Sequence, residues 1–118
     1  MSERIRGYRA FWPYYVAEHS RAWTRRLHFV GTTGAVVLVV AAAALGEPLL
    51  LPAALVCGYF FAWLSHLLIE RNRPATFTYP LFSLAGDFHM WALMWQGRMD
   101  AEVARLASAA KPEEPAAP

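Results

Sequence analysis

The sequence predicts an all-α membrane protein: a two-span helical hairpin with amphipathic, interfacial helices on either side of it. Two observations lead to this fold class. The chain has 118 residues, of which 57% are hydrophobic and 17% charged, and across residues 29–69 the only formally charged side chain is Glu47. Both flanks of this stretch are rich in Arg, which is typical of membrane-spanning segments. The apolar fraction excludes a disordered chain, and the single Cys57 excludes an internal disulfide.

The first element expected is a helix lying at the membrane interface. Its aromatic residues, from Tyr8 to Tyr15, sit among Arg and Glu side chains, a composition suited to a helix with one face in the headgroup region. Ser20 is a residue type that caps helices, so a second helix is predicted to begin at Arg21. His19 then falls at the junction of the two.

The hairpin follows, with spans at residues 29–45 and 49–69. Gly46, Glu47 and Pro48 form a turn signal between them. The spans have about 17 and 21 residues, the length that crosses an apolar slab of about 30 Å. Basic residues lie on both flanks and none lies in the turn, which predicts a multi-pass protein with both termini in the cytoplasm. The membrane is expected to be a bacterial inner membrane.

After the hairpin, Asn72 to Pro74 break the helix and Pro80 opens another apolar segment. This segment, residues 81–96, is interrupted by Asp87 and His89, and the sequence leaves open whether it spans the membrane or lies at its surface. A short charged helix is expected over residues 100–109. We therefore predict one membrane-embedded domain at residues 1–109, and a disordered tail, rich in Pro, Glu and Ala, at residues 110–118.

The net charge of +2 is too small to indicate nucleic-acid binding, in which the apolar spans would have no role. The basic flanks instead favour contact with anionic membrane lipid. A homo-oligomer is compatible with the sequence.

The residues that carry chemistry are four histidines: His19, His28, His66 and His89. In an antiparallel hairpin His28, at the start of the first span, and His66, near the end of the second, reach the same membrane edge. His19 and His89 flank the spans at the same level. Ionisable groups near membrane depth indicate a functional site, so we expect all four to converge there as metal ligands.

Two carboxylates accompany these histidines. Glu70 is four residues after His66, on the same face of an α-helix, and Asp87 lies in the last apolar segment; each is expected beside the metal or as the partner of a ligating ring. Imidazole with a carboxylate and open positions is the ligand set of non-haem Fe(II), although zinc accepts the same groups.

Two other interpretations remain open at this point. One is a haem-binding membrane protein in which His28 and His66 supply both axial ligands. The other is a non-enzymatic scaffold in which Gly31, Gly34 and the alanines at 41–44 pack against partner helices.

Several segments resemble the Mpo1-like membrane family, over about residues 8–97. The most specific is the histidine, glutamate and Pro-Ala block from His66 to Ala75. The segments that carry the resemblance are residues 11–15 (FWPYY) with Glu18 and His19, 26–32 (RLHFVGT), 63–66 (WLSH), 69–77 (IERNRPATF), and Pro80 with 83–88 (SLAGDF).

The resemblance implies an Fe(II)-dependent dioxygenase of fatty acid α-oxidation, which converts a 2-hydroxy fatty acid and O2 to the fatty acid one carbon shorter. It implies that His19, His28 and His66 are iron ligands. A 2-hydroxy acid chelates Fe(II) through its carboxylate and hydroxyl, and its tail would lie along the apolar hairpin. Candidate partners of the substrate carboxylate are Arg25, Arg26 and Arg73.

Overall fold

The computed structural model describes residues 4–110, and within this range it contains helices and no strand. The predicted all-α class is therefore confirmed. Most of the tail expected at residues 110–118 lies outside the described residues. The elements are α1 (Tyr8–Ala17), α2 (Ala22–Leu45), α3 (Leu50–Ser65), the π-helical turn η1 (His66–Glu70), the 3-10 turn η2 (Ala75–Phe77), α4 (Pro80–Trp95) and α5 (Met99–Ala110).

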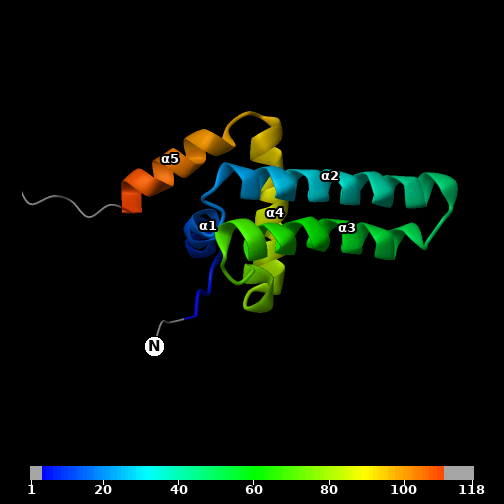
Figure 1. Cartoon of the computed structure of the whole chain (residues 1–118), viewed down its shortest axis with the longest axis horizontal. Coiled ribbons are helices and arrows are strands. Elements are labelled where there is room, and N and C mark those ends of the chain that lie inside the picture. Colours follow the sequence, from blue (N-terminus) through cyan, green and yellow to red (C-terminus); the bar gives the residue numbers. More distant parts are fainter. Residues whose placement is uncertain (1–3, 111–118) are drawn as a thin grey trace, which may run out of the picture.

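Helices α2 and α3 form the predicted hairpin, and α3 continues through η1 (Figure 1). Ala22–Leu45 and Leu50–Glu70 are both long and apolar enough to cross a membrane, and only 22% of each apolar window is buried inside the protein. Gly46 ends α2 with a φ of 65°, a left-handed conformation that glycine adopts without strain. The turn lies where the sequence predicts it.

The first helix of the hairpin begins at Ala22, next to the predicted helix start at Arg21 and seven residues before the apolar span at residue 29. Its 24 residues are about 36 Å long at 1.5 Å per residue, more than the apolar thickness of a bilayer. The amphipathic residues before the apolar span are thus the first turns of the same helix.

The two hairpin helices approach closely at two glycines of α2. A Cβ atom at Gly31 would lie 2.8 Å from Cβ of Phe61, and one at Gly34 would lie 2.7 Å from Sγ of Cys57. Small residues of this kind allow helix backbones to come together in a membrane. This contact fixes α2 against α3 one turn beyond His28.

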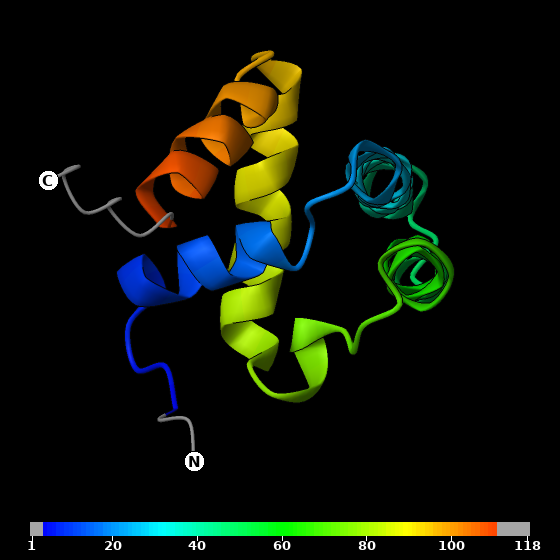
Figure 2. The same cartoon turned by 60° about the vertical axis from the view of Figure 1, so that its left-hand side comes forward.

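The remaining helices gather at one end of the hairpin, opposite the turn. In Figure 1, α4 runs across α2 and α3 rather than alongside them. Figure 2 looks nearly along the hairpin and shows α1 crossing α4, with α5 returning beside it. The segment 81–96 therefore lies across the hairpin axis, in the position of an interfacial helix.

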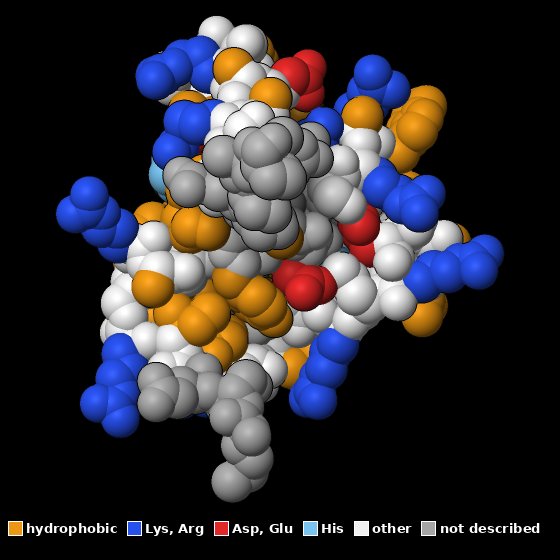
Figure 3. Space-filling view, turned by 90° about the vertical axis from the view of Figure 1, so that its left-hand side faces the viewer, with side chains coloured by type: hydrophobic (Ala, Val, Ile, Leu, Met, Phe, Trp, Pro, Cys, Tyr) orange, Lys and Arg blue, Asp and Glu red, His pale blue; other side chains and the backbone are white. Residues whose placement is uncertain are grey.

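Aromatic and sulfur-containing side chains fill the core of this end of the molecule. Phe11 and Tyr15 of α1 are fully buried, and Met90 of α4 and Met99 of α5 pack with them. Figure 3 shows the outer face of the same end, where Arg side chains stand around the rim. This packing holds α1 across α4. The short junction after α1, which contains His19, therefore lies against the hairpin.

Candidate metal centre

Three of the four predicted histidines meet in one buried cluster. His19 follows α1, His28 lies on α2, and His66 lies where α3 passes into η1; all three side chains are buried. One ring nitrogen from each lies within 4.8 Å of the others. The ring centroid of His19 is 4.5 Å from those of His28 and His66.

His19 is oriented by the backbone of α1. Its Nδ1 lies 2.6 Å from the carbonyl oxygen of Tyr15, and its ring stacks on the Tyr15 ring at a centroid distance of 3.9 Å. Because a carbonyl only accepts hydrogen bonds, Nδ1 carries the proton and Nε2 presents its lone pair. Arg25 is also buried, and its guanidinium donates to the carbonyl oxygen of His19 at 2.8 Å.

His66 is oriented by Asn72, which the sequence interpretation treated only as part of a helix break. The side-chain oxygen of Asn72 lies 2.6 Å from Nδ1 of His66. Its amide nitrogen donates to the backbone oxygen of Glu18 at 3.2 Å and to the Glu18 carboxylate. This network assigns the oxygen of Asn72 to His66, so Nδ1 is the donor and Nε2 again presents a lone pair.

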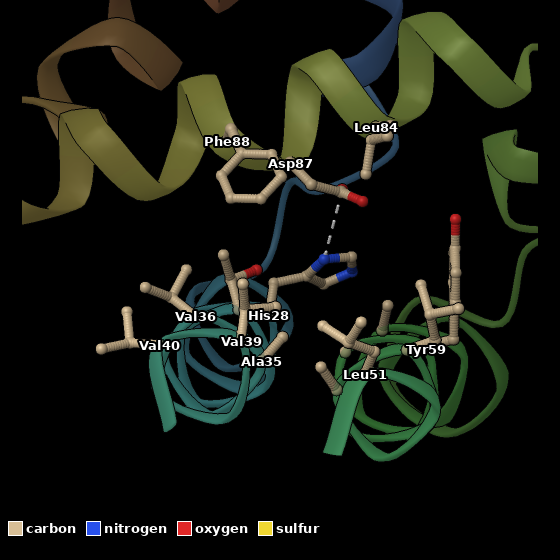
Figure 4. A pocket seen from close by; sticks show the side chains of 15 residues that line it. His28, Ala35, Val36, Val39, Val40, Leu51, Tyr59, Leu84, Asp87 and Phe88 are labelled. Carbon is tan, nitrogen blue, oxygen red and sulfur yellow. Dashed lines mark ion pairs between the residues drawn. The ribbon is translucent and has the colours of Figure 1, made fainter. Parts of the chain in front are cut away.

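His28 is oriented by Asp87, as the sequence predicts for a partner of a ligating ring. Its Nδ1 faces Oδ1 of Asp87 at 3.6 Å (Figure 4), and the hydroxyl of Tyr15 donates to the same oxygen at 2.5 Å. A carboxylate opposite Nδ1 favours the proton on that nitrogen. Nε2 of His28 is buried and has no hydrogen-bond partner among the described residues.

The three oriented rings fit a metal ion. Nε2 of His19 and Nε2 of His66 are 3.0 Å apart, and with both protons on Nδ1 their lone pairs face each other, an arrangement that a cation stabilises. Adjacent ligands with bonds of about 2.1 Å are separated by about 3 Å. Burial, followed by the neighbouring His28 and His66, lowers the pKa of His19 well below its usual value, which keeps its ring in the neutral, ligating form.

His89 lies apart from this cluster. Its ring stacks on Trp12 at a centroid distance of 3.7 Å, and its Nδ1 is 2.9 Å from the hydroxyl of Tyr8. It follows Asp87 by two residues, about 200° around the helix, so it faces α1 when Asp87 faces α2. The expected convergence of four histidines is therefore a convergence of three.

Glu70 also differs from its expected position. Its carboxylate accepts hydrogen bonds from the backbone nitrogen of Arg21 at 2.8 Å and from Oγ of Ser20 at 3.2 Å, which places it at the start of α2. We expected Glu70 to lie beside His66 because residues four apart share one face of an α-helix. The residues from His66 to Glu70 form a π-helical turn, in which position i+4 no longer lies directly above position i.

None of the three arginines suggested for a substrate carboxylate lines the cavity beside the histidines. Arg25 is engaged with His19 and pairs with Asp100 at 3.3 Å. Arg26 lies over the Trp23 ring at 5.0 Å, and Arg73 lies over the Phe77 ring at 5.2 Å.

That cavity has a volume of about 460 Å³ and opens from His28 and Asp87 into the groove between α2 and α3. Figure 4 shows α4 covering the end at which His28 and Asp87 meet, with apolar side chains of α2 and α3 along the rest. The polar cluster is thus continuous with an apolar groove.

A comparison with protein families finds one that matches residues 5–99, described as Mpo1-like, 2-hydroxy-palmitic acid dioxygenase Mpo1-like. The matched range contains the whole histidine cluster. No curated protein and no solved structure gives a significant match.

Proposed function

This chain belongs to the Mpo1-like family, and on that basis we propose that it is an Fe(II)-dependent dioxygenase that converts a 2-hydroxy fatty acid and O2 to the fatty acid one carbon shorter. The observation that carries the proposal is that three buried histidines, His19, His28 and His66, each bring one ring nitrogen within 4.8 Å of the others. Bound iron would supply the redox chemistry that activates O2, with positions left open for substrate.

The protein's own residues hold the ligating rings in the required state. The carbonyl of Tyr15, the amide oxygen of Asn72 and the carboxylate of Asp87 each face one Nδ1 atom. Such partners fix the tautomer of a ligating histidine and raise its basicity. The three rings are therefore preorganised, and burial keeps bulk water from them.

The surroundings of the cluster support the proposed substrate class. A fatty acid has a polar head and an apolar tail, and the cavity has His28 and Asp87 at one end and an apolar groove beyond them. No arginine of the described residues lines the cavity to pair with a carboxylate, so we expect the metal centre to be the main contact of the head. This supports a substrate that binds a metal through adjacent carboxylate and hydroxyl groups.

The haem alternative has less support. The ring centroids of His28 and His66 are 5.2 Å apart, and the ring of His19 lies 4.5 Å from both. A macrocycle held between two axial imidazoles requires a free plane between them. His19 occupies that region.

The proposal includes a membrane location with both termini in the cytoplasm. Variants Glu47→Cys and Ser108→Cys, each in a Cys57→Ala background, test it with a membrane-impermeant maleimide on intact cells. Labelling at position 47 alone is expected. Labelling at position 108 alone would show the opposite orientation and contradict this part of the proposal.

Metal content and oxygen consumption test the activity. Protein purified anaerobically with Fe(II) is expected to hold about one iron per chain and to consume O2 with 2-hydroxypalmitate. His66→Ala is expected to lose both properties. His89→Ala is the matched control, because His89 lies outside the cluster, and it is expected to retain the iron. Iron binding unaffected by His66→Ala would overturn the site, and iron without O2 consumption would overturn the activity.

A further inference from the structure

The groove between the hairpin helices runs from the histidine cluster towards the turn. On α2 its lining includes Thr32, Val36 and Val40, which follow His28 at steps of four residues along one helix face. On α3 it includes Leu51, Leu55, Tyr59 and Ala62. Because the helices are antiparallel, Leu51 lies at the same end as Val40, and Ala62 lies at the end of His28.

We infer that this groove binds a single extended acyl chain, with the lipid headgroup at His28 and Asp87, and that Val40 and Leu51 at its far end determine the longest chain accepted. The inference rests on the proposed function, because it takes the 2-hydroxy fatty acid as the occupant. It adds where the tail lies and which residues select its length.

The length of the groove suits a long-chain acid. His28 and Val40 are twelve residues apart on one helix, which is about 18 Å at 1.5 Å per residue. With carbon–carbon bonds of about 1.5 Å at tetrahedral angles, an extended chain advances about 1.25 Å per carbon. The groove therefore accommodates about fourteen carbons beyond the headgroup.

The width of the groove suits one hydrocarbon chain and not a helix. A volume of about 460 Å³ spread over about 18 Å gives a cross-section of about 25 Å², close to that of one chain whose carbons contact the wall at about 4 Å. A partner helix of about 10 Å diameter and the same length needs about 1,400 Å³. A partner helix is therefore too large to lie inside the groove.

The distribution of polar groups gives the direction of the ligand. The imidazole and the carboxylate of the lining, His28 and Asp87, are together at the end covered by α4 (Figure 4). Val39, Val40 and Leu51 line the opposite end. A ligand with one polar end is therefore held in a single orientation.

Photolabelling locates the tail without turnover. Two 2-hydroxy fatty acids of sixteen carbons, one with a diazirine at the terminal carbon and one with a diazirine near C4, are bound anaerobically to the Fe(II)-loaded protein in micelles. After irradiation, mass spectrometry is expected to place the terminal label near Val40 and Leu51, and the C4 label near Thr32 and Ala62. A sixteen-carbon alkane diazirine reports the labelling that any apolar probe gives.

Substitutions at the lining test the selection of length. Val40→Trp is expected to shorten the longest acid that competes with the C4 probe. Val36→Trp, four residues closer to His28, is expected to shorten it by about five further carbons. Val37→Trp is the matched control: Val37 and Val40 are 59% and 61% exposed, but Val37 does not line the groove. It is expected to leave the length profile unchanged.

The outcomes separate this inference from the proposed function. If the labels lie in the predicted order but the protein consumes no O2, the groove is supported as the acyl-chain site and the proposed dioxygenase activity is rejected. The protein could instead turn over 2-hydroxypalmitate while both acid probes label the lipid-facing side broadly, as the alkane probe does. That result would reject the groove as the acyl-chain site and keep the proposed activity. Equal effects of Val40→Trp and Val37→Trp on the longest acid that competes would also overturn the groove.

Discussion

The side-chain oxygen of Asn72 lies 2.6 Å from Nδ1 of His66, and the amide nitrogen of Asn72 is bound to Glu18 at the end of α1. One side chain thus links the orientation of a hairpin histidine to the element that carries His19. Arg71, with a φ of 56°, ends η1 and turns the chain so that Asn72 points back at His66.

Asn72→Ala is expected to weaken metal binding by about 10- to 100-fold, because the ring of His66 loses the acceptor that fixes its tautomer. Isothermal titration with Zn²⁺, which does not oxidise, measures this change. Gln96→Ala removes an amide that bonds only to Arg98 among the described contacts and serves as the control. Equal affinity in wild type and Asn72→Ala would contradict the role given to Asn72.

Tyr15→Phe is expected to destabilise the protein by about 1–2 kcal/mol, since the half-buried Asp87 loses the hydrogen bond that the Tyr15 hydroxyl donates while the ring packing is kept. Thermal unfolding in micelles of the metal-free protein measures the effect. Tyr14→Phe is the comparison, because Tyr14 packs on Tyr79 rather than on Asp87. An unchanged melting temperature in Tyr15→Phe would show that the hydroxyl contributes no net stability.

Gly31→Ala is expected to cost about 1–3 kcal/mol and to weaken metal binding, because a Cβ there comes 2.8 Å from Cβ of Phe61 and must push α2 from α3. Unfolding and Zn²⁺ titration report the two effects. Gly7→Ala has no atom of the described residues within 4 Å of its new Cβ and is expected to change neither. If both variants behave alike, the close approach of the helices is not needed for the site.

Acid is expected to loosen α5 from α1. The hydrogen bond from Arg105, followed by that from Trp12, lowers the pKa of Glu102 below its usual value of 4.5. A carboxyl with a lowered pKa in the folded state contributes stability that is present above the usual pKa and is lost as the pH falls through the folded value. The indole N–H signal of Trp12, which donates to Glu102, is expected to move below about pH 4.5.

In Glu102→Gln the signal of Trp12 should no longer titrate in that range. A signal that titrates identically in the variant would assign the effect to another group.

The hairpin was predictable because its signal lies in the composition of a continuous segment. The absence of charge over residues 29–69, broken only at Glu47, indicates two spans and a turn whatever the details of packing. The antiparallel arrangement then places His28 near His66. The start of α2 at Ala22 agrees with the helix start predicted at Arg21. The absence of charge does not give this start, because Trp23 to Arg26 are amphipathic and lie outside the apolar span.

The remaining details depend on angles that sequence spacing does not give. His89 and Asp87 are neighbours in sequence, yet they face different helices because they lie on opposite sides of α4. The position of Glu70 follows from a π-helical turn, which has no distinct sequence pattern. Asn72 was missed because an Asn shortly before a Pro is more typical of a turn than of a histidine partner; its spacing of six residues from His66 was the one available signal.

The contact at Gly31 and Gly34 also bears on how the hairpin adapts to bilayers of different thickness. A helix longer than the hydrocarbon layer adapts by tilting, and α2, with 24 residues, is such a helix. Since the two helices are held together close to the histidines and are joined by the short turn after Gly46 at the other end, we expect them to tilt as a pair. We therefore expect the distances between the three histidines to stay the same in membranes of different thickness.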